Sequence, residues 1–317
     1  ALLNMLEICS IARFQPPPRR APRLRSMSGA LTQKGGVLFV GSHARTARLR
    51  THDLDGRRLA GGFTFRDSER ERSSVEGIAV DEDRRLWVAD GQGLSLRTFS
   101  LFGREIANVP AGKEDLAGQI GRPTGVSVTG TDDEFLVGVT SAGLRRHGAQ
   151  ILSPNSGRMV SLRPLGNPEG FFRDAQGIVL QDEEAWVLEA RTPRLQVFKQ
   201  GAFHYALPLP EIDGAWPQAF ALAPGGRSVV AWGGESGAVL LLGPDGRVNG
   251  CLAAAGEEVG GVSHPTGILV VPGEDDRHTR VVLLDHGGSR VQVFNLEGNC
   301  YGASVGSSLG GGEVESG

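Results

Sequence analysis

The chain has 317 residues, a formal net charge of −3 and 22% charged residues. No apolar run approaches the roughly 20 residues that a membrane-spanning helix needs. Residues 1–26 hold five arginines against one acid, so the rest of the chain is more acidic than the total charge suggests. An acidic body disfavours sequence-independent binding of nucleic acid, which depends on lysines and arginines that neutralise phosphates. We therefore expect a soluble globular protein that neither crosses a membrane nor binds nucleic acid.

The N-terminal 24 residues run from a mixed apolar stretch through Pro16, Pro17 and Pro18 into a basic end. Proline fixes φ and lacks the backbone donor, so the three prolines separate the apolar stretch from the rest of the chain. Two interpretations remain open. The arginine-rich leader resembles an organellar targeting segment, or "MLEICSIARF" adds an outer strand to the last repeat and helps to close the fold. We favour the second, and the sequence predicts no compartment.

A repeat with a period close to 48 residues occupies most of the chain. Six segments align, and their third residues are separated by 48, 48, 52, 42 and 48 positions. Such self-similarity indicates a repeat architecture. The aligned third residues, which we call the first-strand glycines although one is alanine, are Gly29, Gly77, Gly125, Gly177, Ala219 and Gly267.

Each repeat predicts four short strands. In the second repeat, apolar residues 78–80 precede a polar turn and a second apolar run at 86–89. A third strand comes next, as in "RLQVF" (194–198) and "RVQVF" (290–294), and then a glycine turn and a weaker fourth strand. Alternation and β-rich composition favour strands over helices. Six units of four antiparallel strands predict an all-β, six-bladed β-propeller.

An acid ends the second strand of several repeats, and an arginine lies five residues later. The pairs are Glu189 with Arg194 and Asp285 with Arg290, and Asp90 holds the acid position of the second repeat. The pair flanks one tight turn, so we interpret it as orienting the hairpin. Exposed pairs typically contribute less than about 1 kcal/mol.

"HPTGILV", "LWVAD" and "SRVQVF" resemble the NHL-repeat family over roughly residues 25–305. The resemblance is sharp in repeats two, four and six. It is loose in repeat five, where Ala219, Gly233 and Ala238 replace the glycine, the acid and the arginine. Trp232 of that repeat lies close to the register of Trp87 and Trp186, so we expect all three to pack between blades. The resemblance implies fold more than function.

The predicted domains are a leader at 1–24, an NHL-like propeller at 25–305 and a flexible tail at 306–317. The tail, "SSLGGGEVESG", is glycine-rich and acidic.

The residues just before the first-strand glycines predict a binding face. In the NHL-like propeller that the resemblance implies, the first strands line a central channel, and these residues form a polar ring at its mouth. Trp216, just before the fifth repeat's first strand, should lie on the same face. An exposed tryptophan is a common interface anchor. The predicted partner-binding residues are Ser28, Glu76, Thr124, Gln176, Trp216, Gln218 and Thr266.

Enzymes similar to NHL propellers imply an alternative. Gluconolactonase-type lactonases hold a divalent cation at this channel, which needs several oxygen ligands, but only Glu76 could serve here. The peptidyl-hydroxyglycine amidating lyase uses histidine-bound zinc, and His43, His264 and His286 would be its ligands here. Solvated turn histidines are the simpler interpretation. RNA binding, known for some NHL propellers, is disfavoured by the acidic body.

We therefore favour a non-enzymatic scaffold that binds a protein or peptide segment, without metal or cofactor, as a subunit or accessory protein of a complex. The alternative is a metal-dependent lyase or hydrolase that uses the channel face. The partner, the pathway and the oligomeric state cannot be inferred from the sequence.

Overall fold

The structure is a computed structural model. It describes residues 27–31, 38–43, 47–53, 58–65, 72–81, 85–112, 120–131, 134–143, 147–166, 171–288 and 290–305. Within these strands, the description does not extend to the side chains of residues 27–31, 38–40, 42, 43, 58, 60, 131, 134, 304 and 305. The predicted leader (1–24) and tail (306–317) lie outside the described residues, so both interpretations of the leader stay predictions.

The first three sheets hold twelve strands: β1 Met27–Leu31, β2 Leu38–His43, β3 Ala47–His52, β4 Arg58–Phe65, β5 Val75–Val80, β6 Arg85–Asp90, β7 Ser95–Ser100, β8 Glu105–Pro110, β9 Arg122–Thr131, β10 Glu134–Ala142, β11 His147–Ser153 and β12 Arg158–Ser161. The next three hold twelve more: β13 Ala175–Gln181, β14 Glu184–Glu189, β15 Arg194–Lys199, β16 Ala202–Pro208, β17 Ala215–Ala223, β18 Arg227–Gly234, β19 Ala238–Leu242, β20 Val248–Ala254, β21 Pro265–Val271, β22 Arg280–Asp285, β23 Arg290–Asn295 and β24 Cys300–Val305.

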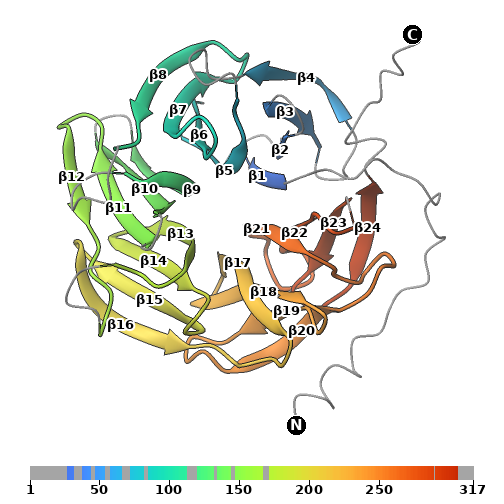
Figure 1. Cartoon of the computed structure of the whole chain (residues 1–317). Helices are drawn as coiled ribbons and strands as arrows, with labels where there is room; N and C mark the ends of the chain where they lie inside the picture. Colours follow the sequence, from blue (N-terminus) through green and yellow to red (C-terminus); the bar gives the residue numbers. More distant parts are fainter. Residues whose placement is uncertain are drawn as a thin grey trace.

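The strands form six four-stranded antiparallel sheets, each a meander of consecutive strands, which we number as blades 1 to 6 in chain order. The first strand of every blade is innermost, and β21 packs beside β1, so the sheets form a closed ring around a channel (Figure 1). The prediction of four-stranded antiparallel blades in a β-propeller is confirmed. Closure of this kind leaves only short, protected sheet edges.

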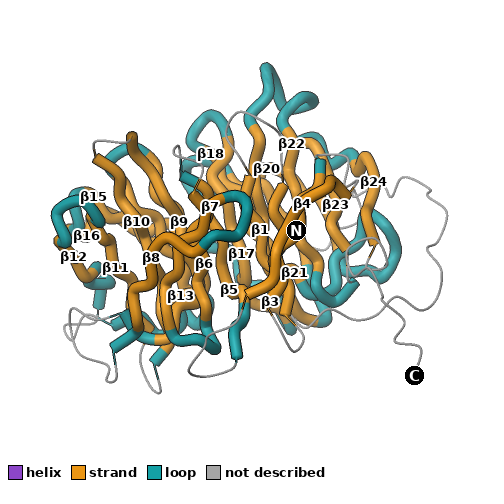
Figure 2. Tube along the Cα trace, turned by 90° about the horizontal axis from the view of Figure 1, so that it is seen from above, coloured by secondary structure: helices purple, strands orange, loops and turns teal. Residues whose placement is uncertain are grey.

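Loops gather at the two faces of the ring, which Figure 2 shows edge-on. Because strands alternate in direction, one face carries the starts of the first strands, the turns between second and third strands, and the linkers between blades. We call this the mouth face and the opposite one the far face. No helix among the described residues is long and apolar enough to cross a membrane.

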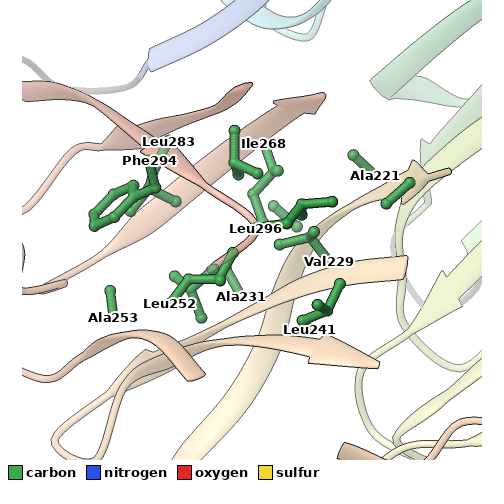
Figure 3. Packing of buried hydrophobic residues seen from close by; sticks show 14 of the residues in the cluster. Ala221, Val229, Ala231, Leu241, Leu252, Ala253, Ile268, Leu283, Phe294 and Leu296 are labelled. Carbon is green, nitrogen blue, oxygen red and sulfur yellow. The ribbon is translucent and has the colours of Figure 1, made fainter. Parts of the chain in front are cut away.

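The core lies between neighbouring blades. Second and third strands are buried on both sides, as in β19, whose five residues are all buried, whereas all six residues of β8 on the rim are exposed. Between blades 5 and 6, Val229 and Leu241 pack against Leu283 and Phe294 (Figure 3). Strands buried on both sides therefore appear as continuous apolar runs, and outer strands as weak ones.

Close approach of the inner strands explains the glycine at Gly77. A Cβ atom there would lie 2.9 Å from the Cα of Gly125 and 2.9 Å from the amide nitrogen of Val126, both in blade 3. Backbone cannot yield as a flexible side chain can. At Gly177, by contrast, the nearest atom would be 3.7 Å away, on the Phe220 ring. The spacing between blades 4 and 5 thus leaves room for a methyl group.

The acid–arginine pair is a buried tether, so the expectation of an exposed pair is wrong. Asp285 is fully buried and Arg290 is 2% exposed. Asp285 accepts the backbone N–H of His264 (2.7 Å) and the Nε–H of Arg290 (2.9 Å). Arg290 also donates to four carbonyls of the linker between blades 5 and 6, those of Gly256, Glu257, Glu258 and Gly261, at 2.5 to 3.0 Å. The pair orients the hairpin and fastens the preceding linker.

Blades 2 and 4 vary this tether. In blade 4, Glu189 accepts from Arg194 Nε (2.7 Å), and Arg194 reaches one linker carbonyl, that of Leu165 (3.3 Å). In blade 2 the arginine has moved two residues along the third strand, where Arg97 lies 3.5 Å from Asp90 and also pairs with Glu105 on β8.

Blade 5 has no such pair, because Trp232 occupies the register of the acid. Trp232 pairs with Pro217 and Ala238 as Asp285 pairs with Pro265 and Arg290. The sequence assignment of Gly233 to the acid position is therefore wrong by one residue, and Trp232 does not share the register of Trp186. Trp232 and Ala238 are fully buried. Replacing a buried ion pair by apolar residues that fill the space is often neutral or stabilising.

Candidate functional site at the channel mouth

The predicted polar ring lines the mouth of the channel. Five of its residues, which we call the inner ring with Ser28 as its sixth position, line a cavity of about 590 Å³ between the first strands: Glu76, Thr124, Gln176, Gln218 and Thr266. The first-strand residues of blades 2 to 6 surround the same cavity, with apolar walls below the ring that include Val126, Ile178, Phe220 and Ile268. The side chain of Ser28 lies outside the described residues. The described part of the site is a polar collar above an apolar shaft.

A second ring of residues surrounds the first, and it was not predicted from the sequence. In each of blades 2 to 6, a further residue lies two positions before the inner-ring residue. It lies at or immediately before the start of the first strand, so its side chain is on the mouth face. We call them the outer ring: Ser74, Arg122, Asp174, Trp216 and His264. The same alignment of six segments contained this signal, but only Trp216 and His264 were recognised.

Outer-ring side chains hold the inner ring by hydrogen bonds. Glu76 accepts from Ser74 Oγ (2.8 Å) and from Arg122 Nη2 (3.3 Å) of the neighbouring blade. Gln176 Nε2 donates to Asp174 Oδ1 (2.7 Å). The inner-ring carboxylate is therefore paired with a cation, which leaves the collar with little net charge and reduces its capacity to bind a divalent ion.

Trp216 is fixed in the same way. The Gln218 side-chain amide has one orientation in which both its oxygen and its nitrogen form hydrogen bonds. In that orientation the oxygen accepts from Trp216 Nε1 (3.1 Å) and the nitrogen donates to the Pro265 carbonyl of blade 6 (2.6 Å). Trp216 is nevertheless 49% exposed, one of few large apolar side chains so exposed among the described residues. A side chain at Gly233 would collide with Gln218, so the glycine there makes room for this arrangement. The indole is held in place with much of its surface open to a partner.

Two of the three candidate zinc ligands come together. The His264 and His286 rings are 6.0 Å apart, and His264 is exposed. His43 lies at the end of β2, and its side chain is outside the described residues. No group of three or more histidine, cysteine, aspartate or glutamate side chains suited to a metal ion occurs within the described part of the chain. This geometry supplies two imidazoles, where a zinc site in a lyase normally needs three protein ligands.

The comparison with protein families finds no match, and that with curated proteins finds none either. Solved structures share the fold. A chain from the nidogen/laminin complex is 15% identical, with a TM-score of 0.61 over 86% of this chain and 94% of that one. Streptogramin B lyase is 14% identical, with a TM-score of 0.55 over 90% and 84%. A catalytically inactive virginiamycin B lyase from Staphylococcus aureus, with quinupristin, is 11% identical, with a TM-score of 0.56 over 90% and 88%. At these identities the likeness shows the β-propeller fold alone, in proteins that include both a binding partner and enzymes.

Proposed function

We propose that residues 25–305 form a six-bladed, NHL-like propeller that acts as a binding scaffold and captures a polypeptide segment on its mouth face. The six four-stranded sheets and the acid–arginine tethers support the NHL assignment. The observation that carries the function is Trp216, half exposed and fixed by Gln218 beside the channel.

The chemistry of the two rings suits an extended peptide. Amide and hydroxyl groups of Gln176, Gln218 and Thr266 can exchange hydrogen bonds with a peptide backbone, and Trp216 offers apolar burial beside them. Binding energy at interfaces is concentrated in a few anchors, with tryptophan prominent among them. The matching chain from the nidogen/laminin complex supports a role in protein recognition, because a chain with this fold occurs there in a protein complex.

The test is selection from a random peptide library displayed on phage, panned against the full chain. We expect the selected peptides to bind the Trp216→Ala variant at least about 30-fold more weakly, since such an anchor contributes roughly 2 kcal/mol. The matched control is Phe102→Ala, which removes an aromatic side chain that is 96% exposed in a turn on the far face. Peptides that bind Trp216→Ala as well as the parent chain would overturn the proposal.

A metal-dependent lyase or hydrolase is the second candidate, because His264 and His286 lie together on the mouth face. It requires further ligands beyond the two imidazoles. Stoichiometric zinc in purified protein, measured by mass spectrometry and lost in His264→Ala, would favour the enzyme over the scaffold.

A further inference from the structure

A second cavity, of about 590 Å³, opens on the far face between blades 4 and 5. Its wall includes the turn between β13 and β14 with Asp182, the start of β14 with Glu184 and Trp186, and Tyr205 of β16. Blade 5 contributes Arg227 and several turn residues. The cavity thus lies at the opposite end of the ring from the proposed peptide site, and it combines two aromatic side chains with two carboxylates.

The aromatic rings and one carboxylate form a fixed corner. The Trp186 and Tyr205 ring centroids are 5.9 Å apart, with the ring planes at 89°. Glu184 Oε2 accepts from Trp186 Nε1 at 3.2 Å, which fixes the carboxylate beside the indole. Burial raises the pKa of the Tyr205 phenol, and the negative charge of Glu184 raises it further. The Glu184 carboxylate therefore interacts electrostatically with the phenol.

The cations around this corner are already engaged. Arg227 donates to both oxygens of Asp276 (2.8 and 2.6 Å) and to the Pro224 carbonyl (2.8 Å). Lys199, opposite Glu184 in the β14–β15 register, pairs with Glu183 (3.4 Å). Within the described part of the chain, neither Asp182 nor Glu184 forms an ion pair. The corner therefore keeps an uncompensated negative charge beside aromatic rings.

The corresponding corner of blade 2 shows what such a site accepts. Trp87 matches Trp186, since each pairs with the residue two positions after its first-strand glycine. Asp81 accepts from Trp87 Nε1 (2.9 Å) and from Arg85 Nε (2.7 Å). The Arg85 guanidinium lies over the Phe135 ring of blade 3, 4.8 Å from its centroid.

The corner of blade 2 thus contains a carboxylate, an indole, a second aromatic ring and a guanidinium that the chain itself supplies. In blade 4 the position of Arg85, two before the tryptophan, is taken by Glu184. The blade 4 corner therefore has the aromatic rings and the carboxylate but supplies no guanidinium of its own.

We propose that the cavity between blades 4 and 5 binds a guanidinium group, from a small molecule or an arginine side chain, between the Glu184 carboxylate and the rings of Trp186 and Tyr205. A guanidinium is planar, keeps its charge, is weakly hydrated, stacks on aromatic faces and can bind a carboxylate through two N–H groups. A lysine ammonium is more strongly hydrated and lacks the planar fork. The site is independent of the peptide site on the mouth face.

The test is calorimetric titration of the full chain with N-acetyl-arginine methylamide and with its citrulline counterpart, which has the same shape without the charge. We expect saturable binding of the arginine compound and at least about tenfold weaker binding of the citrulline compound. Glu184→Gln keeps an acceptor for the Trp186 indole but removes the charge, and it should weaken arginine binding by a similar factor. Glu211→Gln, which makes the same change at an exposed acid of the linker before blade 5, outside this cavity, is the matched control and should bind as the parent does.

Equal binding of the two compounds, no saturable binding, or full binding by Glu184→Gln with an unchanged melting temperature would each overturn the proposal. Free arginine and an arginine-centred pentapeptide, titrated in parallel, distinguish the two sources of the group. A small-molecule site binds both equally, and a protein-recognition site binds the pentapeptide more tightly.

Discussion

Replacing Arg290 by alanine tests whether the tether holds blade 6 and its linker in place. The variant removes the cation beside Asp285, which is fully buried, and it removes one donor from each of four linker carbonyls. The Gly261 carbonyl keeps the bond from Gln292 Nε2 (2.7 Å) and the Glu258 carbonyl keeps the backbone N–H of Gly261 (3.0 Å), so the carbonyls of Gly256 and Glu257 are the ones most affected. Asp285 keeps the backbone N–H groups of Ser263 and His264. Removing one partner of a buried pair typically costs about 3–5 kcal/mol.

At about 2 °C per kcal/mol for a chain of this size, Arg290→Ala should lower the melting temperature by roughly 6–10 °C in scanning calorimetry. Arg194→Ala is the matched control, because Arg194 is more exposed and reaches one linker carbonyl, so its loss should be smaller. Adding Asp285→Asn to Arg290→Ala should recover part of the loss, since the uncompensated charge disappears. A melting temperature for Arg290→Ala within about 2 °C of the parent would refute this account of the tether.

Other variants address the channel, the contact between blades 5 and 6, and the far-face cavity. Gly77→Ala should destabilise the fold by several kcal/mol, because its methyl group meets the backbone of blade 3. Gly177→Ala should change the free energy of unfolding by less than about 1 kcal/mol, because its methyl group has room. Equal effects of the two variants in urea denaturation would contradict the packing argument. Hydrogen bonds from Arg227 lower the pKa of Asp276, so this carboxylate stabilises the fold above its unfolded pKa, near 4, and the contribution is lost as pH falls through the folded value. Asp276→Asn should therefore cost less than about 1 kcal/mol at pH 7, because the pair is partly exposed, and nothing near pH 2; an equal loss at both pH values would count against the pair. Glu184→Gln should lower the pKa of Tyr205, and ultraviolet titration can follow it because the chain has two tyrosines; an unchanged titration would show that burial alone sets the shift.

The blades were predictable because each repeats one pattern of strand and turn. Residues 86–89 and 239–242 are continuous apolar runs because second and third strands are buried on both sides, and this signal survives without knowledge of neighbouring blades. The polar collar was predictable from the same alignment, since a residue's distance from the first-strand glycine fixes its height in the channel.

Contacts between blades were not predictable from the repeat. The pairing of Arg122 with Glu76 joins residues 46 positions apart, and nothing in either segment indicates which rotamers meet. The sequence-based register of Trp232 was wrong because Trp232 and Ala238 together replace the acid and the arginine of the other blades. These two residues lie on different strands, so neither replacement is recognisable from its own segment. The far-face corner was not predictable either, because its walls come from β14, β16 and the turns of blade 5, which are separated in the sequence.

Blade 5 lacks the ionic tether, and its linker leads directly to Trp216. The segment at 209–214 is held by backbone hydrogen bonds, from Leu209 to the Pro193 carbonyl (2.9 Å) and from Glu235 to the Gly214 carbonyl (3.1 Å). If these hydrogen bonds open, no buried charge loses its partner. If the linker before blade 6 opens, by contrast, Arg290 and its hydrogen bonds become exposed to solvent. Local opening free energies are low where few buried contacts must break. The linker beside Trp216 can therefore open without breaking an ion pair, whereas the linker before blade 6 cannot, and under the proposed function this difference lets blade 5 fit its surface to a bound segment.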